Sequence, residues 1–192
     1  MSIGFKEWSL ICDFLEKGSQ TVILRKGGIA EGREGFQFRH PAFFLFPTHF
    51  HEQEKHLCDR FLAGAAPLGE EAPTADSERK EIAVRLYAET VRTFVLHDWG
   101  QVQALAPFHA WSETTVRERF DYKDAPGISV AVLRAYRLPG EWVFPNSNRF
   151  GGCRSWLELP ECPAALFEGK FPVLDNDAFA SVLASLPLPA SD

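Results

Sequence analysis

The segment 128–138, ISVAVLRAYRL, is the strongest predicted strand of the chain and the feature that most constrains its fold. Further extended segments are predicted at 21–25, 36–38, 43–46, 82–95 and 153–159, and helices at 5–16, 51–62, 101–105, 113–119 and 178–186. Because strands do not alternate regularly with long helices, a doubly wound parallel sheet is disfavoured. The pattern predicts an α+β fold with a mixed or antiparallel sheet, or a small barrel, and flanking helices.

We expect residues 1–192 to form one α+β domain. The chain is 45% hydrophobic and 24% charged, which is typical of a globular protein. A chain of this length can bury roughly 70% of its unfolded surface, so it needs neither disulfides nor a metal to fold. The clearest change in composition lies at 64–77, where two Pro, two Gly and no aromatic residue predict a solvated loop. Ser112 is expected to cap the helix 113–119, and Asp177 the helix 178–186.

The charge balance limits the possible partners. The chain has 20 Lys and Arg against 26 Asp and Glu, a net charge of −6. Such a chain lacks the overall attraction to phosphate that drives non-specific nucleic-acid binding. A nucleic-acid partner must therefore meet a local basic patch, whereas small molecules face no such barrier.

Cysteine usage and the absence of targeting signals indicate a cytoplasmic protein. The four cysteines form no C-x-x-C pair and are expected to be free structural thiols. Lys6 and Glu7 stand where a signal peptide has its apolar core, and no apolar run reaches the ~20 residues of a membrane helix. We expect no membrane partner. The Walker A and G-x-G-x-x-G fingerprints are absent, so we expect no cofactor, and the oligomeric state stays open.

Basic and aromatic residues together suggest a groove for phosphates and bases. Arg25 and Lys26 precede a Gly pair whose backbone N–H groups could face a phosphate, and we expect both cations to contact it. Arg134 and Arg154 are expected to line the same groove, and Trp156 to stack a base, since guanidinium planes and indoles hold unstacked bases. The alternative is a buried Trp156 with arginines that reach solvent or pair with nearby carboxylates.

Histidines gather where the extended segment 43–46 leads into the predicted helix 51–62. His49 and His51 can share one face of an extended chain, and a third donor such as His56 could complete an open metal site. In that interpretation His51 and Glu52 are the catalytic candidates. The alternative is a structural role, because side chains at a turn before a helix form hydrogen bonds with unpaired backbone groups. We expect no resident metal.

Several short stretches resemble a bacterial family catalogued as a domain of unknown function. The similarity covers about residues 5–160, and the family has no established activity. Some of its members are linked to restriction-endonuclease-type domains, so the resemblance implies a DNA-related context. The matching stretches are KEW (6–8), LRKGGI (24–29), HPxF (40–43), FPT (46–48), HxW (109–111), LRxYRL (133–138) and GGCxSW (151–156).

The opening of the chain also resembles, more distantly, the ASCH branch of the PUA-like fold. That branch has a helix followed by G-x-K-x-x-E-x-R on a strand beside its ligand cleft. Gly18 and Arg25 match this pattern, but Gln20 replaces its lysine and Ile23 its glutamate. The resemblance implies a PUA-like barrel. The two replacements remove the pair that ASCH-type hydrolysis would need, which leaves binding of nucleic acid or a modified base as the implied function.

The sequence therefore favours a protein that binds nucleic acid or a nucleotide-like ligand in a local basic and aromatic groove. His40, His51 and Trp111 are expected at its polar rim. Two other interpretations stay open. One is a metal-dependent hydrolase or nuclease that uses His51 and Glu52, and the other is a non-catalytic protein-interaction module with an exposed apolar patch.

Overall fold

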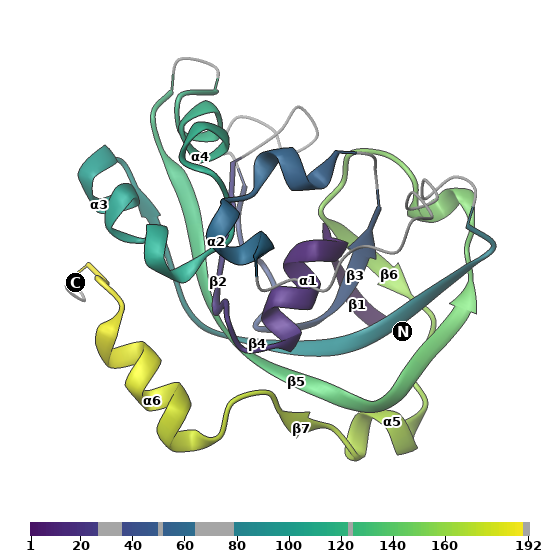
Figure 1. Cartoon of the computed structure of the whole chain (residues 1–192). Coiled ribbons are helices and arrows are strands. Elements are labelled where there is room, and N and C mark those ends of the chain that lie inside the picture. The colour runs from purple at the N-terminus through teal and green to yellow at the C-terminus, as the bar shows by residue number, and fades with distance from the viewer. Residues whose placement is uncertain (27–35, 50–51, 64–78, 123–124, 190–192) are drawn as a thin grey trace.

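The computed structural model describes residues 1–26, 36–49, 52–63, 79–122 and 125–189 of the chain. Its centre is a curved seven-stranded sheet whose main path has the order β2-β5-β4-β3-β1-β6, while β7 pairs with β5 beside this path (Figure 1). β1 and β3 are parallel and the other pairs are antiparallel, so the sheet is mixed. The strands are β1 (Ser2–Trp8), β2 (Val22–Arg25), β3 (Ala42–Thr48), β4 (Glu81–Leu96), β5 (Ile128–Pro145), β6 (Trp156–Leu159) and β7 (Phe171–Pro172).

The long strands β4 and β5 give the sheet its curvature. Their pairing shifts twice, once where Arg85 alone faces residues 138–141 and once where Val91 is the extra residue on β4. Such bulges bend a strand and increase its twist. The first one contains Pro139, which has no N–H to donate to a ladder, and Gly140, which weakens a regular strand. Both strands consequently wrap around the concave side of the molecule (Figure 1).

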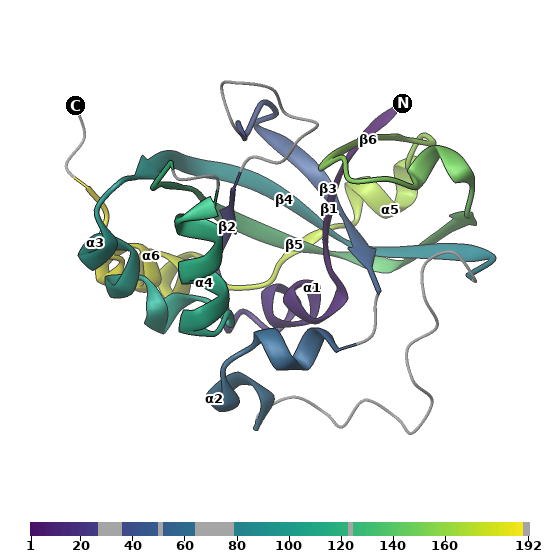
Figure 2. The same ribbon diagram turned by 90° about the horizontal axis from the view of Figure 1, so that it is seen from above.

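The concave side of the sheet holds the main hydrophobic core. Helix α1 (Ser9–Glu16) lies across one end of the curve (Figures 1 and 2) and buries one face against the strands. Each large apolar side chain removed from water contributes roughly 1.5–3 kcal/mol. The fully buried members of this core include Phe5, Ile11, Leu15, Val22, Leu24, Phe43, Val130 and Val132.

A second, smaller core lies where β4 and β5 continue past their first bulge. It joins buried aromatic rings of β3 and β5 to Phe150, and α5 packs along β5. Its buried members are Phe44, Phe46, Ile82, Val84, Leu138, Trp142, Phe144, Phe150, Leu157 and Leu159.

Short helices surround the sheet. β7, α5 and α6 follow the outer side of β5 (Figure 1). No helix in the described ranges is long and apolar enough to cross a membrane. The helices are η2 (Gln53–His56), α2 (Asp59–Leu62), α3 (Trp99–Ala104), η4 (Ala106–Phe108), α4 (Glu113–Phe120), η6 (Asn148–Phe150), α5 (Ala164–Glu168) and α6 (Asn176–Ser185).

The α+β class with a mixed sheet and flanking helices is confirmed, but three local predictions are wrong. Residues 5–8 belong to β1 rather than to the helix predicted at 5–16, and the helix predicted at 51–62 is two short pieces, η2 and α2. The cap of α6 is Asp175, whose Oδ1 accepts from the Ala178 N–H at 2.8 Å, and not Asp177. Ser112 caps α4 as predicted. The predicted loop 64–77 lies outside the described residues.

Candidate functional site

A cavity of about 840 Å³ is lined by four basic side chains: Lys6, Arg25, Arg79 and Arg154. No Asp or Glu is found among the described residues that line it. The sequence suggested Arg25 and Arg154 for such a groove but missed Lys6 and Arg79. Basic residues from four separate segments of an acidic chain therefore line one cavity.

The floor of this cavity follows from the alternation of side chains on β1 and β3. Lys6 and Trp8 point to one face of β1, and their register partners Phe46 and Thr48 lie beside them on β3. All four line the cavity. The Lys6 Nζ donates to the Gly152 carbonyl at 2.9 Å, which joins this floor to the opposite wall.

The wall of the cavity is the segment 146–155. The Asn146 side-chain amide donates to the Arg79 carbonyl at 3.0 Å, and the Asn146 N–H donates to the Lys80 carbonyl at 2.8 Å, so the wall is tied to the start of β4. Gly152 has φ 79°, a left-handed conformation that favours glycine. Buried Phe150 fixes this wall to the second core.

A second hollow of about 440 Å³ shares Arg154 with the cavity. Trp156, His40 and Arg149 also line it, together with the carboxylate of Glu158. Because Arg154 borders both hollows, the two are adjacent. We call the basic residues that line these two adjacent hollows the cationic strip: Lys6, Arg25, Arg79, Arg149 and Arg154.

Trp156 is half-buried: it packs against the core and also lines the second hollow. Its ring packs against Phe5 at 4.8 Å and Phe43 at 5.1 Å between ring centroids, and against His40 at 4.8 Å. Its Nε1 donates to the Gln37 carbonyl at 3.3 Å. The strand predicted at 153–159 is shorter in the structure, because β6 begins only at Trp156 and Arg154 precedes it. The two residues meet at the second hollow.

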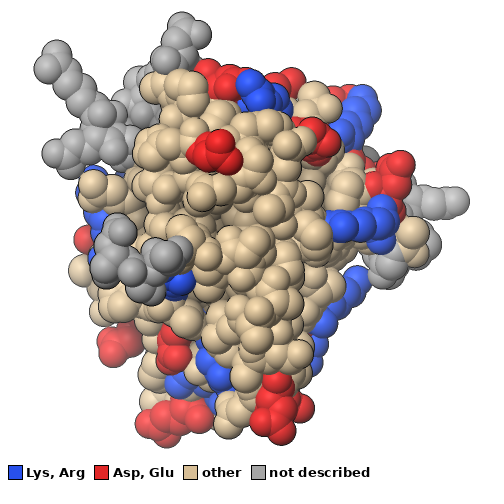
Figure 3. Space-filling model, turned by 90° about the vertical axis from the view of Figure 1, so that its left-hand side faces the viewer, with Lys and Arg blue, Asp and Glu red and all other residues tan. Residues whose placement is uncertain are grey.

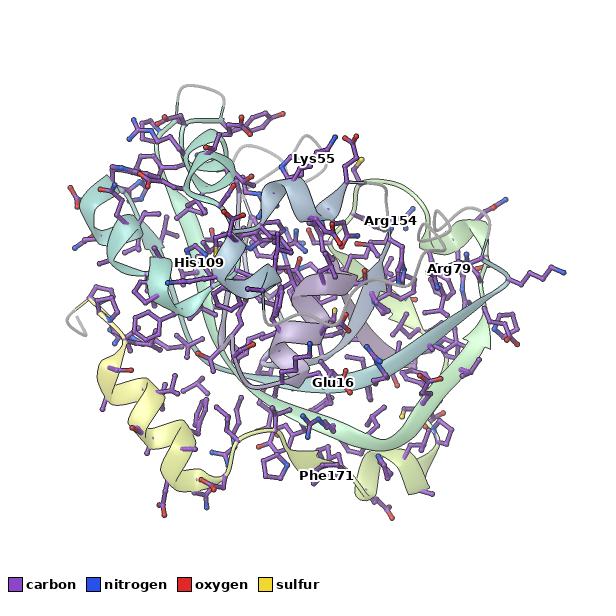
Figure 4. All side chains as sticks on the ribbon, in the orientation of Figure 1. Glu16, Lys55, Arg79, His109, Arg154 and Phe171 are labelled. Carbon is purple, nitrogen blue, oxygen red and sulfur yellow. The ribbon has the colours of Figure 1, made fainter. Side chains whose placement is uncertain are left out.

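The cationic strip occupies one side of the molecule. Figure 4 shows Arg79 and Arg154 on the right of the view, whereas His109 lies on the left. Figure 3 shows the left-hand face of the molecule, where the Lys, Arg, Asp and Glu side chains lie mainly around the margin of a broad uncharged area. The basic residues gathered at the cavity have no counterpart at the centre of that face.

Arg134 does not join the groove predicted for it. Its Nη2 donates to Asn176 Oδ1 at 2.5 Å, and its guanidinium lies 4.9 Å from the centre of the Phe179 ring. Both contacts belong to α6, on the outer side of β5. The expectation that Arg134 and Arg154 line one groove is therefore wrong, because the curved sheet separates them.

Lys26 is held by backbone rather than directed into the cavity. Its Nζ donates to the Phe120 carbonyl at 3.1 Å, to the Gly127 carbonyl at 2.9 Å and to the Ala125 carbonyl. Burial lowers the pKa of Lys26, and the nearby Asp121 opposes that shift. These bonds satisfy carbonyl groups at and after the C-terminus of α4, where a cation is favoured. Gly27 and Gly28 lie outside the described residues.

Trp111 is a core residue, which corrects its prediction as part of a polar rim. It is 2% exposed, and the Arg119 guanidinium lies 3.7 Å from its ring centre. Its ring also meets that of Trp8 edge to face at 4.4 Å. No local sequence pattern indicates this burial, since Trp111 stands in a short segment between two helices.

The histidine-rich segment does not assemble a metal centre in the part of the chain that the structure describes. No group of three His, Cys, Asp or Glu side chains there could hold a metal ion. His51 lies outside the described residues, while exposed Glu52 accepts from the Lys55 Nζ at 2.5 Å. His56 Nδ1 and Thr115 Oγ1 share a hydrogen bond of 3.1 Å, and His49 lines the cavity.

A buried ionic cluster behind the cavity was not foreseen. Glu7 is 1% exposed on β1, and its Oε2 lies 3.4 Å from the Arg25 Nη2. Its Oε1 accepts from the Trp8 N–H at 2.9 Å. Burial lowers the pKa of Arg119 on α4 to about 10, with Arg25 adding to the shift and Glu7 opposing it. The signal that could have located Glu7 is its place between Lys6 and Trp8, since alternation on a strand sends it to the opposite face.

Comparisons with known proteins define the family. No match was found among curated proteins. Among solved structures, the fold is similar to a crystal structure of a mutant ZmASCH protein from Zymomonas mobilis, with a TM-score of 0.47 and 11% sequence identity over 96% of this chain and 94% of that one. The model of the family described as Domain of unknown function (DUF1802) matches residues 4–185. This chain therefore belongs to the DUF1802 family.

Proposed function

We propose that this protein binds nucleic acid in single-stranded or nucleotide form through the cationic strip. The observation that carries the proposal is the cavity with four basic side chains and no carboxylate among its described lining residues, in a chain of net charge −6. Such a site supplies the local positive potential that an acidic protein needs in order to attract phosphate.

The cationic strip contains two kinds of basic side chain that could bind phosphate. Lys6 and Arg25 are partly engaged by protein, through the Gly152 carbonyl and the Glu7 carboxylate. They form a fixed positive floor. Arg154 is exposed where the two hollows meet, and half-buried Arg79 lines the cavity from the segment just before β4. A guanidinium can bind a phosphate through two parallel hydrogen bonds, so these two arginines suit successive phosphates of one strand.

Aromatic rings stand beside the cations in both hollows. Trp8 lines the cavity, and half-buried Trp156 lines the second hollow. Stacking of a base on an aromatic ring is worth about 1–3 kcal/mol and needs bases that are unpaired. This combination favours a single strand over a duplex, whose bases are already stacked on each other.

The test is fluorescence anisotropy with a labelled single-stranded dodecamer at low and moderate salt. We expect the double variant R79Q/R154Q to bind at least tenfold more weakly than the unchanged protein, because it loses two phosphate contacts. The matched control is R85Q/R117Q, which removes the same charge from two arginines that pair with acidic residues away from the cavity. It should lose less than threefold. Equal loss in both variants, or no salt-dependent binding by the unchanged protein, would refute the proposal.

A further inference from the structure

Buried polar atoms without a hydrogen-bond partner gather at one place in the described structure. Glu7 Oε2, Arg25 Nε, Trp111 Nε1 and Arg119 Nη1 are four such atoms, and the only others in the described residues are the two ring nitrogens of His109. Folded proteins pair nearly all of their buried polar groups, so four such atoms on two contacting pairs, Glu7 with Arg25 and Trp111 with Arg119, call for an explanation. We call these four residues the buried cluster.

The buried cluster is continuous with the cavity. Arg25 belongs to both, since it lines the cavity and forms the ion pair with Glu7 at 3.4 Å. Trp8 also lines the cavity, and its ring contacts Trp111 at 4.4 Å and the Arg119 guanidinium at 5.5 Å. Trp8 and Arg25 therefore separate the cluster from the cavity. A ligand that enters from the cavity would have to displace one of these two side chains, and side-chain changes of this kind are common on binding.

The donor and acceptor character of the four atoms indicates which class of ligand they could bind. Three are N–H donors and one is a carboxylate oxygen, which only accepts. A phosphate offers acceptors alone, and its charge would oppose that of Glu7. The edge of a nucleobase is uncharged, planar and carries acceptors beside a donor, so it can satisfy both kinds of atom.

We infer that the buried cluster is a subsite that reads the edge of one base of the bound strand. The inference rests on the proposed function, because the cationic strip must first hold the phosphates. Stacking on Trp8 accepts every base, whereas hydrogen bonds to Glu7 and Trp111 distinguish one base from another. The protein would then prefer a particular base at one position.

Trp111→Phe is the decisive variant. The Trp111 Nε1 has no hydrogen-bond partner among the described residues, so in a purely structural role its removal breaks no hydrogen bond seen there. Phe keeps an apolar ring under Arg119. Glu7→Gln is the second variant, since it replaces one acceptor by a donor while keeping the shape of the side chain. Thermal unfolding identifies any variant that fails to fold, and the other variant then decides.

The experiment measures dissociation constants for four single-stranded homohexamers, one for each DNA base, and for an abasic hexamer with the same phosphates. We expect the four bases to differ by at least tenfold. Trp111→Phe should reduce that spread at least threefold and leave the affinity for the abasic hexamer unchanged, and Glu7→Gln should alter which base binds best.

The outcomes separate the two proposals. Equal affinity for all four homohexamers, or a spread that both variants leave unchanged, overturns the base-reading subsite and leaves binding by the cationic strip intact. Failure of every hexamer, including the abasic one, to bind overturns the proposed function itself. A spread that only the variants of Glu7 and Trp111 reduce, while R79Q/R154Q weakens all five probes equally, supports both.

Discussion

Arg119 and Arg154 carry the same guanidinium group in opposite surroundings. Arg119 lies over the Trp111 ring at 3.7 Å, and burial lowers its pKa to about 10, whereas Arg154 is exposed between the two hollows. The sequence singled out Arg154 because an aromatic residue follows it closely. It gave no reason to choose Arg119, which stands between Glu118 and Phe120 on a predicted helix. Burial, which depends on distant segments, decides which basic residue is available to a ligand.

His109 makes a residue-scale prediction about pH. It is 2% exposed, and burial lowers its pKa from 6.5 to about 4, with further contributions from Arg60 and Arg119. As the pH decreases, His109 therefore becomes protonated near pH 6.5 in the unfolded chain but only near pH 4 in the folded chain. Stability is fully present above pH 6.5 and falls as the pH decreases through this window. The loss reaches about 2 kcal/mol at pH 5 and about 3 kcal/mol below pH 4.

Urea unfolding at pH 7.5 and pH 5 measures this loss, and His109→Leu is the comparison. Neither ring nitrogen of His109 has a hydrogen-bond partner in the part of the chain that the structure describes, so the leucine breaks no hydrogen bond seen there. We expect the variant to lose about 2 kcal/mol less than the unchanged protein between the two pH values. Identical losses would show that His109 does not titrate between the folded and unfolded states as its burial requires.

An element was predictable from the sequence where the spacing of its apolar residues fits either a helix or a strand. It was not predictable where the spacing fits both. The strand at 82–95 and the cap at Ser112 are confirmed within one or two residues, as β4 and α4. Residues 5–16 fit a helical stripe through Phe5 and Trp8, yet the first part is β1. The long-range pairing of Gly4 with β3 and β6 decides this, since a Cβ at Gly4 would lie 2.7 Å from the Leu159 Cδ1. No local pattern contains that contact.

The N-terminus of α6 gives a prediction at the scale of an element. Asp175 Oδ1 accepts from the Ala178 N–H at 2.8 Å, while Asp177 lies within the first turn and makes no capping bond. Asp175→Ala should lower the free energy of unfolding by about 1 kcal/mol, as is typical for the loss of a cap. Asp177→Ala should lower it by at most about 0.5 kcal/mol, the favourable interaction of a carboxylate with the helix dipole. Urea unfolding at pH 7 compares the two, and a larger effect at Asp177 would contradict the observed cap.

At the scale of the whole molecule, the sequence predicted a local basic groove and some of its members, but not all of them. Arg25, Arg154 and Trp156 do border the two adjacent hollows, whereas Arg134 is carried to the outer side of the sheet by the curvature of β5. Lys6 and Arg79 reach the cavity only because β1, β3 and the segment 146–155 meet there. That meeting depends on two bulges and a parallel strand pair, none of which leaves a signature in a short window of sequence.

The contrast between an acidic molecule and its basic cavity sets the salt dependence of binding. Four cations of the described residues line the cavity, so we expect about four phosphates of a single strand to be neutralised there. For single strands the slope of log K against log salt is about −0.7 for each phosphate, which gives about −2 to −3. The bases of a duplex are already stacked on each other and cannot stack on Trp8 or Trp156, and the net charge of −6 repels its two phosphate strands. We therefore expect a duplex of the same sequence to bind at least tenfold more weakly. Anisotropy titrations across the salt range measure both quantities, and a slope steeper than about −5 or a preference for duplex would place the interface on a larger surface than this cavity.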